Sequence, residues 1–194
     1  MRLCLPPDDP VKISSIKAKP WPEMRRAIGR DAILYDPETR AYSFNMDQSY
    51  SYDVEEFISV FLKAEKDPRI AERAKYYQEA VELYNHPYSP QLGGVWVVPI
   101  HESLSRKYGK ALLVVAKYKL DQNQNQACLN YCRKVLDIES CQEKAYQICM
   151  KAYANLTDRN GILRIYTECV NNFNLIYEIE PSLETIQLFE QLIE

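Results

Sequence analysis

The pattern of hydrophobic residues changes character near residue 53. Before this point, five prolines between residues 6 and 22 interrupt any regular period. From residue 53 onward, hydrophobic residues recur at intervals of three and four, which is the period of one helix face. Val54, Phe57 and Phe61 begin this pattern. The sequence therefore predicts a short, largely irregular head followed by an all-helical body of about seven helices.

The head contains one predicted β-hairpin. A short basic helix at residues 24–28 is expected to end at Gly29, the usual residue type after a helix. Two short apolar runs come next, at residues 32–35 and 41–44, and the sequence DPETR separates them. Because Asp followed by Pro favours a type I turn, these runs predict two antiparallel strands.

The first three helices of the body have recognisable boundaries. Asp53 and Glu56 have the spacing of a capping box. Asp67 is predicted to cap the second helix, with Pro68 at its first position. A long helix is expected from about residue 99 to 120. The predicted inward faces of the first two helices are Val54, Phe57, Ile58, Phe61 and Leu62, then Ile70, Ala74, Tyr77, Val81 and Tyr84.

The last part of the chain is internally duplicated. Residues 127–136 align with residues 161–170 at an offset of 34, the period of the tetratricopeptide helix-turn-helix unit. Asp158 or Asn160 is expected to cap the helix between them. The predicted inward residues are Ala145, Ile148, Cys149, Ala152, Tyr153 and Leu156, then Ile162, Ile165, Tyr166, Cys169, Val170 and Phe173, then Leu183, Ile186, Phe189 and Ile193. The predicted fold class is mostly α: a tetratricopeptide-like helical-hairpin array with a small N-terminal β-hairpin.

Charge divides the chain in the same way as hydropathy. The 194 residues carry a net charge of -3, but residues 1–45 hold eight Lys and Arg against six Asp and Glu. The remainder holds 16 basic and 21 acidic residues. A weakly basic head on an acidic body fits a marginal nucleic-acid contact at the N-terminus and protein contacts elsewhere. No signal peptide or membrane span is expected, which predicts a cytoplasmic protein.

The chemistry-bearing residues do not form a recognisable catalytic pattern. Cys128 and Cys132 lie four apart on a predicted helix and could in principle hold a metal, but buried structural thiols are the favoured interpretation. Gly93 and Gly94 lack the remainder of a phosphate-binding loop, and only two histidines are present. We therefore predict a protein that is not an enzyme, with no catalytic residue, no metal and no cofactor.

Several segments resemble the bacterial transcriptional activator domain found in antibiotic regulatory proteins of actinobacteria. The resemblance lies in VLDIESCQEKA at 135–145, AYANLTDR at 152–159, and EPSLET at 180–185, the most distinctive string. Upstream, YDVEEF at 52–57, and PQL at 90–92 followed by Trp96, are also similar. The chain departs from the family at Ser140, where proline is usual, and at residues 155 and 156, where a small residue and glycine are usual.

In that family a winged helix precedes the activator domain, and residues 1–50 resemble its tail. Residues 24–29 look like the end of a recognition helix, and residues 31–45 look like the wing hairpin. The front of the winged helix has no counterpart, and a stub of about six residues is too short to read bases in the major groove. Whether Met1 is the true start stays open. The expected domains are a winged-helix remnant at 1–50 and a helical activator domain at 51–194.

Two sets of residues are candidates for binding. Arg25, Arg26, Arg30 and Arg40 could contact DNA phosphates, although a solvated surface is the favoured interpretation. A concave partner groove could be lined by Tyr118, Tyr131, Tyr146, Tyr153 and Tyr166, although ordinary packing is expected for most of them.

Two functional classes are compatible with the sequence. The first is a regulatory domain that contacts the transcription machinery or another regulatory domain and binds DNA weakly or through a missing upstream segment. The second is a free-standing tetratricopeptide-like adaptor unrelated to transcription.

Overall fold

The computed structural model describes residues 33–38, 41–45, 53–84 and 97–194. The chain divides into two compact units, residues 1–53 and 54–194. The predicted basic helix at 24–28 lies outside the described residues.

The first unit contains the predicted hairpin. Strands β1 (Ile33–Asp36) and β2 (Ala41–Phe44) pair in antiparallel register, with Ile33 opposite Phe44 and Asp36 opposite Ala41. The carboxylate of Asp36 accepts a hydrogen bond of 2.9 Å from the backbone amide of Glu38. This local bond is the reason that Asp favours the start of a turn, and it confirms the predicted hairpin.

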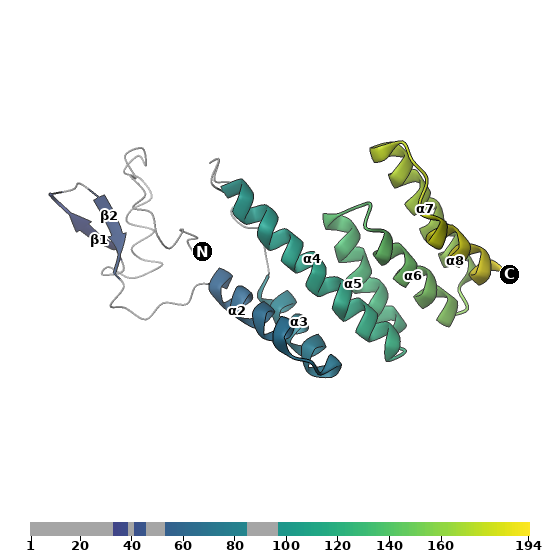
Figure 1. The fold of residues 1–194 in the computed structure, drawn as a ribbon, viewed down its shortest axis with the longest axis horizontal. Helices are drawn as coiled ribbons and strands as arrows, with labels where there is room; N and C mark the ends of the chain where they lie inside the picture. Colours follow the sequence, from purple (N-terminus) through teal and green to yellow (C-terminus); the bar gives the residue numbers. More distant parts are fainter. Residues whose placement is uncertain (1–32, 39–40, 46–52, 85–96) are drawn as a thin grey trace. The chain divides into compact units, whose positions relative to one another are not determined.

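The second unit is an array of helices. Consecutive helices from α3 to α8 contact one another, and α4 also contacts α6, as α6 contacts α8 (Figure 1). Contacts between alternate helices as well as consecutive ones are typical of stacked helical hairpins. The predicted tetratricopeptide-like array is therefore confirmed. Its helices are α2 (Asp53–Lys66), α3 (Ile70–Leu83), α4 (Val97–Asp121), α5 (Asn125–Ile138), α6 (Glu143–Asn155), α7 (Arg159–Tyr177) and α8 (Leu183–Ile193).

The turns between helices repeat with the same 34-residue period. Helices α4 and α6 end at residues 121 and 155, and α5 and α7 begin at residues 125 and 159. Within each turn one residue adopts the left-handed conformation: Asn123 with φ of 57° and Thr157 with φ of 56°. The α4–α5 and α6–α7 hairpins are thus two copies of one unit.

Asp158 caps α7, as one of the two predicted alternatives. Its carboxylate accepts a hydrogen bond of 2.8 Å from the amide of Gly161, which has no partner within the helix. Gly161 is required for packing as well. A Cβ atom built there would lie 2.3 Å from Cδ1 of Tyr153. The glycine therefore allows the start of α7 to approach the end of α6.

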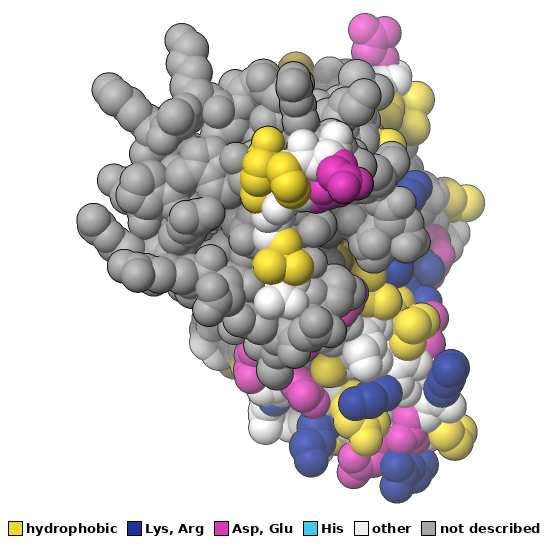
Figure 2. Space-filling model, turned by 90° about the vertical axis from the view of Figure 1, so that its left-hand side faces the viewer, with side chains coloured by type: hydrophobic (Ala, Val, Ile, Leu, Met, Phe, Trp, Pro, Cys, Tyr) yellow, Lys and Arg dark blue, Asp and Glu magenta, His cyan; other side chains and the backbone are white. Residues whose placement is uncertain are grey.

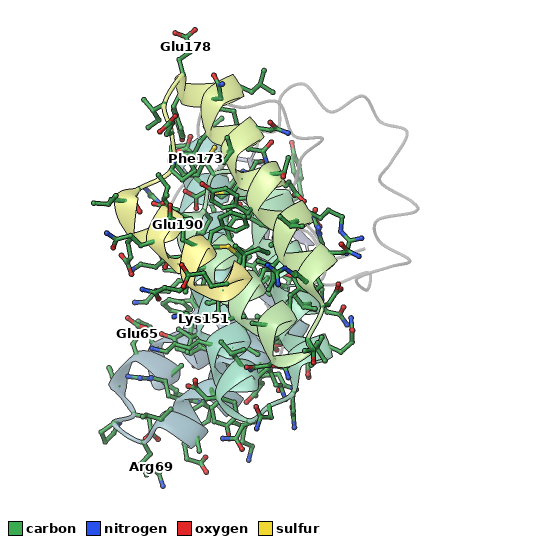
Figure 3. The ribbon with its side chains drawn as sticks, turned by 90° about the vertical axis from the view of Figure 1, so that its right-hand side faces the viewer. Glu65, Arg69, Lys151, Phe173, Glu178 and Glu190 are labelled. Atoms are coloured by element: carbon green, nitrogen blue, oxygen red, sulfur yellow. The ribbon has the colours of Figure 1, made fainter. Side chains whose placement is uncertain are left out.

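A hydrophobic core runs along the array. Aromatic rings join α2 to α3, where the centroids of Phe61 and Tyr77 lie 5.4 Å apart. At the other end, Phe173 is buried on α7. Glu178, which ends α7 in the left-handed conformation, projects away from the helices (Figure 3). The core thus continues from the first helix of the unit to the last hairpin.

Four residues predicted to face inward are exposed. They are Leu62, Ile70, Leu156 and Leu183. Ile70 and Leu183 are the first residues of α3 and α8, and Leu156 follows the last residue of α6. These three residues lie at helix ends, where the apolar pattern of the sequence extends beyond the part of the helix that a neighbouring helix covers. Leu62 lies inside α2.

The second helix also begins later than predicted. Helix α3 starts at Ile70, so Pro68 is not its first residue. Asp67 instead accepts hydrogen bonds from the backbone amide of Arg69, at 2.9 Å, and from its guanidinium. These bonds lower the pKa of Asp67 to about 2. Asp67 therefore closes a local turn before the helix and does not cap its first turn.

The predicted buried cysteines are confirmed. Cys128, Cys132, Cys149 and Cys169 are all buried in the core of the array. Within the described ranges, no three His, Cys, Asp or Glu side chains are placed to hold a metal ion. Among the same residues, no helix is both long enough and apolar enough to span a membrane.

Candidate protein-binding site

A pocket lined by three tyrosines opens where α3, α4 and α5 meet. Its volume is about 650 Å³, which is within the usual range for ligand sites. We call it the tyrosine pocket. Its lining residues are Val81, Glu82, Tyr84, Tyr108, Tyr131, Lys134, Asp137 and Ile138.

The three rings come from α4, α5 and the C-terminal end of α3. Tyr84 follows the last residue of α3, and its ring stacks on Tyr108 of α4 with centroids 4.3 Å apart. Tyr84 also contacts Phe57 of α2, at 5.5 Å between centroids. Tyr131 lies on α5, and all three tyrosines are partly exposed. The core therefore holds one side of the aromatic cluster while its other side borders the pocket.

The charged groups of the pocket are two carboxylates and one ammonium. Glu82 and Asp137 are exposed and form no salt bridge within the described part of the chain. The ammonium of Lys134 lies 5.8 Å from the ring centroid of Tyr131, which is a cation–π distance. Burial raises the pKa of Tyr131, and the negative charge of Glu82 raises it further. Burial likewise raises the pKa of Tyr108.

Outside the tyrosine pocket, basic and acidic side chains lie close to one another. On the face drawn in Figure 2, basic, acidic and hydrophobic side chains are interspersed among the described residues, with no large patch of one sign. The salt bridges of the array are also spread along it, as between Lys110 and Glu65 at 2.7 Å and between Arg133 and Glu168 at 2.7 Å. The tyrosine pocket is therefore distinguished by its aromatic rings more than by its charge.

Only one of the five predicted partner tyrosines, Tyr131, lines this pocket. Tyr146 is fully buried, donates a hydrogen bond of 2.8 Å to the carbonyl of Ser140, and accepts one of 2.7 Å from Asn172. A side chain enclosed in this way cannot meet a partner, so Tyr146 follows the alternative of ordinary packing. Burial raises its pKa to about 12.

The other three tyrosines lie apart from the pocket. Tyr153 packs beside Gly161, and the guanidinium of Arg164 lies 6.0 Å from its ring centroid. Tyr166 stacks on Phe189 of α8 at 3.9 Å. Tyr118 is partly exposed near the end of α4. These tyrosines therefore do not form a single groove.

Tyr84 and Tyr108 are pocket residues that the sequence does not single out as binding residues. The helical period places Tyr84 on an inward face. Tyr108 lies in a part of α4 that has no counterpart in α6, because the residue 34 positions later, Gln142, precedes that helix. A tyrosine just beyond the end of a helix is by itself a weak signal of a binding site. Only the crossing of α3, α4 and α5 brings these two rings to Tyr131.

A second pocket, of about 600 Å³, lies along α4. It is lined by Ser105, Gly109 and Leu113 of that helix and by Val135 and Ile138 of α5, among others. Gly109 is unusual because it is inside a helix, where glycine is unfavourable. A Cβ atom at Gly109 would have no described atom within 4 Å. Packing among the described residues therefore does not require this glycine.

The four candidate phosphate-binding arginines, Arg25, Arg26, Arg30 and Arg40, lie outside the described residues.

Comparison with protein families gives a match that covers most of the chain. The model of the bacterial transcriptional activator domain matches residues 52–193. The chain belongs to this family. A search of curated proteins found no match.

Membership of the bacterial transcriptional activator domain family confirms the resemblance seen in the sequence. The family is regulatory and is not a family of enzymes, and it acts in transcriptional activation. This favours the first of the two functional classes over an adaptor unrelated to transcription.

Proposed function

We propose that the helical array activates transcription by binding another protein, and that the tyrosine pocket is part of the contact surface. The partner is the transcription machinery or another regulatory domain of the same system. One observation supports this most: three partly exposed tyrosines, from α4, α5 and the C-terminal end of α3, border one pocket. Aromatic residues that fill or line such pockets supply much of the energy of protein interfaces.

The stacked-hairpin architecture supports the same proposal. Arrays of this kind present extended surfaces on which a partner can lie. The residues from 46 to the C-terminus are acidic by five charges, which disfavours nucleic acid as the main ligand of the array.

The test uses the chromosomal gene in the organism that encodes the chain. We expect Tyr108→Ala together with Tyr131→Ala to change the same transcripts as a deletion of the gene. Tyr177→Ala is the matched control, because Tyr177 is 57% exposed on α7 and does not line the pocket. Immunoblots and thermal melts establish that all variants are present and folded.

Two outcomes would contradict the proposal. If the deletion changes no transcript, the chain does not regulate transcription. If the deletion changes transcripts and the double variant does not, the tyrosine pocket is not the contact surface.

A weak contact with DNA is a separate part of the proposal. Arg25, Arg26, Arg30 and Arg40 would touch phosphates, so this chain alone should bind duplex DNA without sequence preference and lose binding steeply as salt rises. A footprint at one specific sequence at physiological salt would contradict this expectation.

A further inference from the structure

The tyrosine pocket carries both aromatic faces and an excess of negative charge. Its three rings belong to Tyr84, Tyr108 and Tyr131, and its two carboxylates to Glu82 and Asp137. Lys134 is the one basic side chain of the lining, so the carboxylates outnumber the cations two to one. Aromatic faces attract cations through their quadrupole, and carboxylates attract them through charge.

The chain itself demonstrates that a cation can lie on one of these rings. The ammonium of Lys134 lies 5.8 Å from the centroid of Tyr131 and forms no salt bridge with any described residue. Tyr84 and Tyr108 have no such cation over their rings within the described part of the chain. Part of the pocket thus has the chemistry of a cation site but no cation from the described residues.

We infer that the tyrosine pocket binds an arginine side chain of the protein partner. A guanidinium is planar and can lie flat against a tyrosine ring. Its five N–H donors can reach carboxylates on two sides, whereas the ammonium of a lysine is a more strongly hydrated point charge. Glu82 from α3 and Asp137 from α5 come from different helices of the lining, which suits a ligand with several donors.

This inference rests on the proposed function, because it names the chemical group by which the partner is recognised. Lys134 then acts as a competitor. Its ammonium already uses the face of Tyr131 and offsets part of the negative charge. Removal of Lys134 should therefore strengthen arginine binding, an effect opposite to that of removing a carboxylate.

The experiment titrates the full chain, labelled with ¹³C in its tyrosine rings, with the tripeptide acetyl-Gly-Arg-Gly-amide and follows the ring signals by NMR. The signals of Tyr84, Tyr108 and Tyr131 are assigned with Tyr→Phe variants. We expect saturable shifts of these three signals with the arginine peptide. The same peptide with citrulline, which is neutral and similar in shape, should bind about tenfold more weakly, and the lysine peptide should also bind more weakly.

Matched variants test the role of charge. Glu82 accepts a hydrogen bond of 3.2 Å from Gln78, which the amide oxygen of a glutamine can also accept. Glu82→Gln should therefore weaken arginine binding by roughly fivefold through charge alone, whereas Glu79→Gln, an exposed glutamate of the same helix outside the pocket, should have no effect. Lys134→Gln should strengthen it by a similar factor. Higher salt should weaken binding of the arginine peptide to the wild-type chain.

Three results would overturn the inference: no saturable shift, equal binding of the arginine peptide and either other peptide, or equal effects of Glu82→Gln and Glu79→Gln. Such a result would leave the proposed function standing if the pocket variants still change transcripts. If the arginine peptide binds as expected but the pocket variants leave the transcripts unchanged, the proposed function is contradicted and the arginine site is still supported.

Discussion

The two halves of the helical array surround Tyr131 and Tyr146 differently. In the α3–α5 half, Tyr84, Tyr108 and Tyr131 are partly exposed around a pocket. In the α6–α8 half, Tyr146 is enclosed and hydrogen-bonded, and Tyr166 stacks on α8. The residue type is the same, but the positions in the repeat are not, because at the 34-residue offset Tyr131 corresponds to Ile165 and Tyr146 to Leu112. The α6–α8 half also contains a final helix, α8, that contacts both α6 and α7. We call it the sealed half, and we call the α3–α5 half the open half.

Polar contacts also join α8 and the residue before it to α6. Thr185 of α8 is fully buried and accepts a hydrogen bond of 2.8 Å from Gln147 of α6. The backbone amide of Ser182, just before α8, donates a bond of 2.6 Å to the carboxylate of Glu143. The sealed half should therefore contribute stability, and the open half should contribute binding. Substitutions in each half can test this division.

The largest effect is expected for Tyr146→Ala. Removal of a fully buried ring should lower the free energy of unfolding by about 3–5 kcal/mol, because it leaves a cavity. Tyr131→Ala, at the open pocket, should cost about 1–2 kcal/mol. Urea unfolding followed by circular dichroism measures both. Equal costs would show that the two halves do not differ as described.

Gly161→Ala should be the next most harmful change. Its Cβ would lie 2.3 Å from the ring of Tyr153 and 2.7 Å from the carboxylate of Asp158, so both must move. We expect a loss of about 1–3 kcal/mol, typical of overpacking. The combination with Tyr153→Leu should recover part of this loss in urea melts. A neutral Gly161→Ala would mean that α6 and α7 are less closely packed.

Tyr146→Phe isolates the hydroxyl group. Loss of its bonds to Ser140 and Asn172 should cost about 1–2 kcal/mol near neutral pH. Because the folded pKa of Tyr146 is about 12 against an ordinary value of 10.0, the unfolded chain ionises first. The stability from the neutral phenol is therefore complete below pH 10 and is lost as pH rises toward 12.

The measurement is the free energy of unfolding of wild type and Tyr146→Phe at several pH values. The difference between them should shrink above pH 10. A constant difference would show that Tyr146 does not contribute to alkaline unfolding.

The smallest effect, and the one of opposite sign, is expected for Gly109→Ala. The new Cβ meets no described atom within 4 Å, so the gain in helix propensity should stabilise the chain by up to about 1 kcal/mol. A rise in melting temperature checks this. A loss of stability would show that Gly109 is tightly packed, and the open half would then resemble the sealed half.

Local sequence signals predict the helices and their order, because helix period, turn residues and the 34-residue repeat are local properties. Asp36 begins the turn that the sequence predicts, and Asp158, one of two predicted alternatives, caps α7, since each accepts a hydrogen bond from an amide within three residues. Helix ends were less predictable. Ile70 and Leu183 continue the apolar pattern, but no helix in the described part of the chain covers them.

Which tyrosines are enclosed and which border a pocket depends on the tertiary structure. Neither Tyr146 nor Tyr131 lies on an inward face that the helical period predicts, so periodicity did not separate them. Tyr84 and Tyr108 are 24 residues apart in the sequence, yet their rings stack at 4.3 Å. Exposure and ring contacts depend on how helices cross, which involves residues far apart along the chain and no local signal. For this reason the sequence predicted the array, while the pocket became visible only in three dimensions.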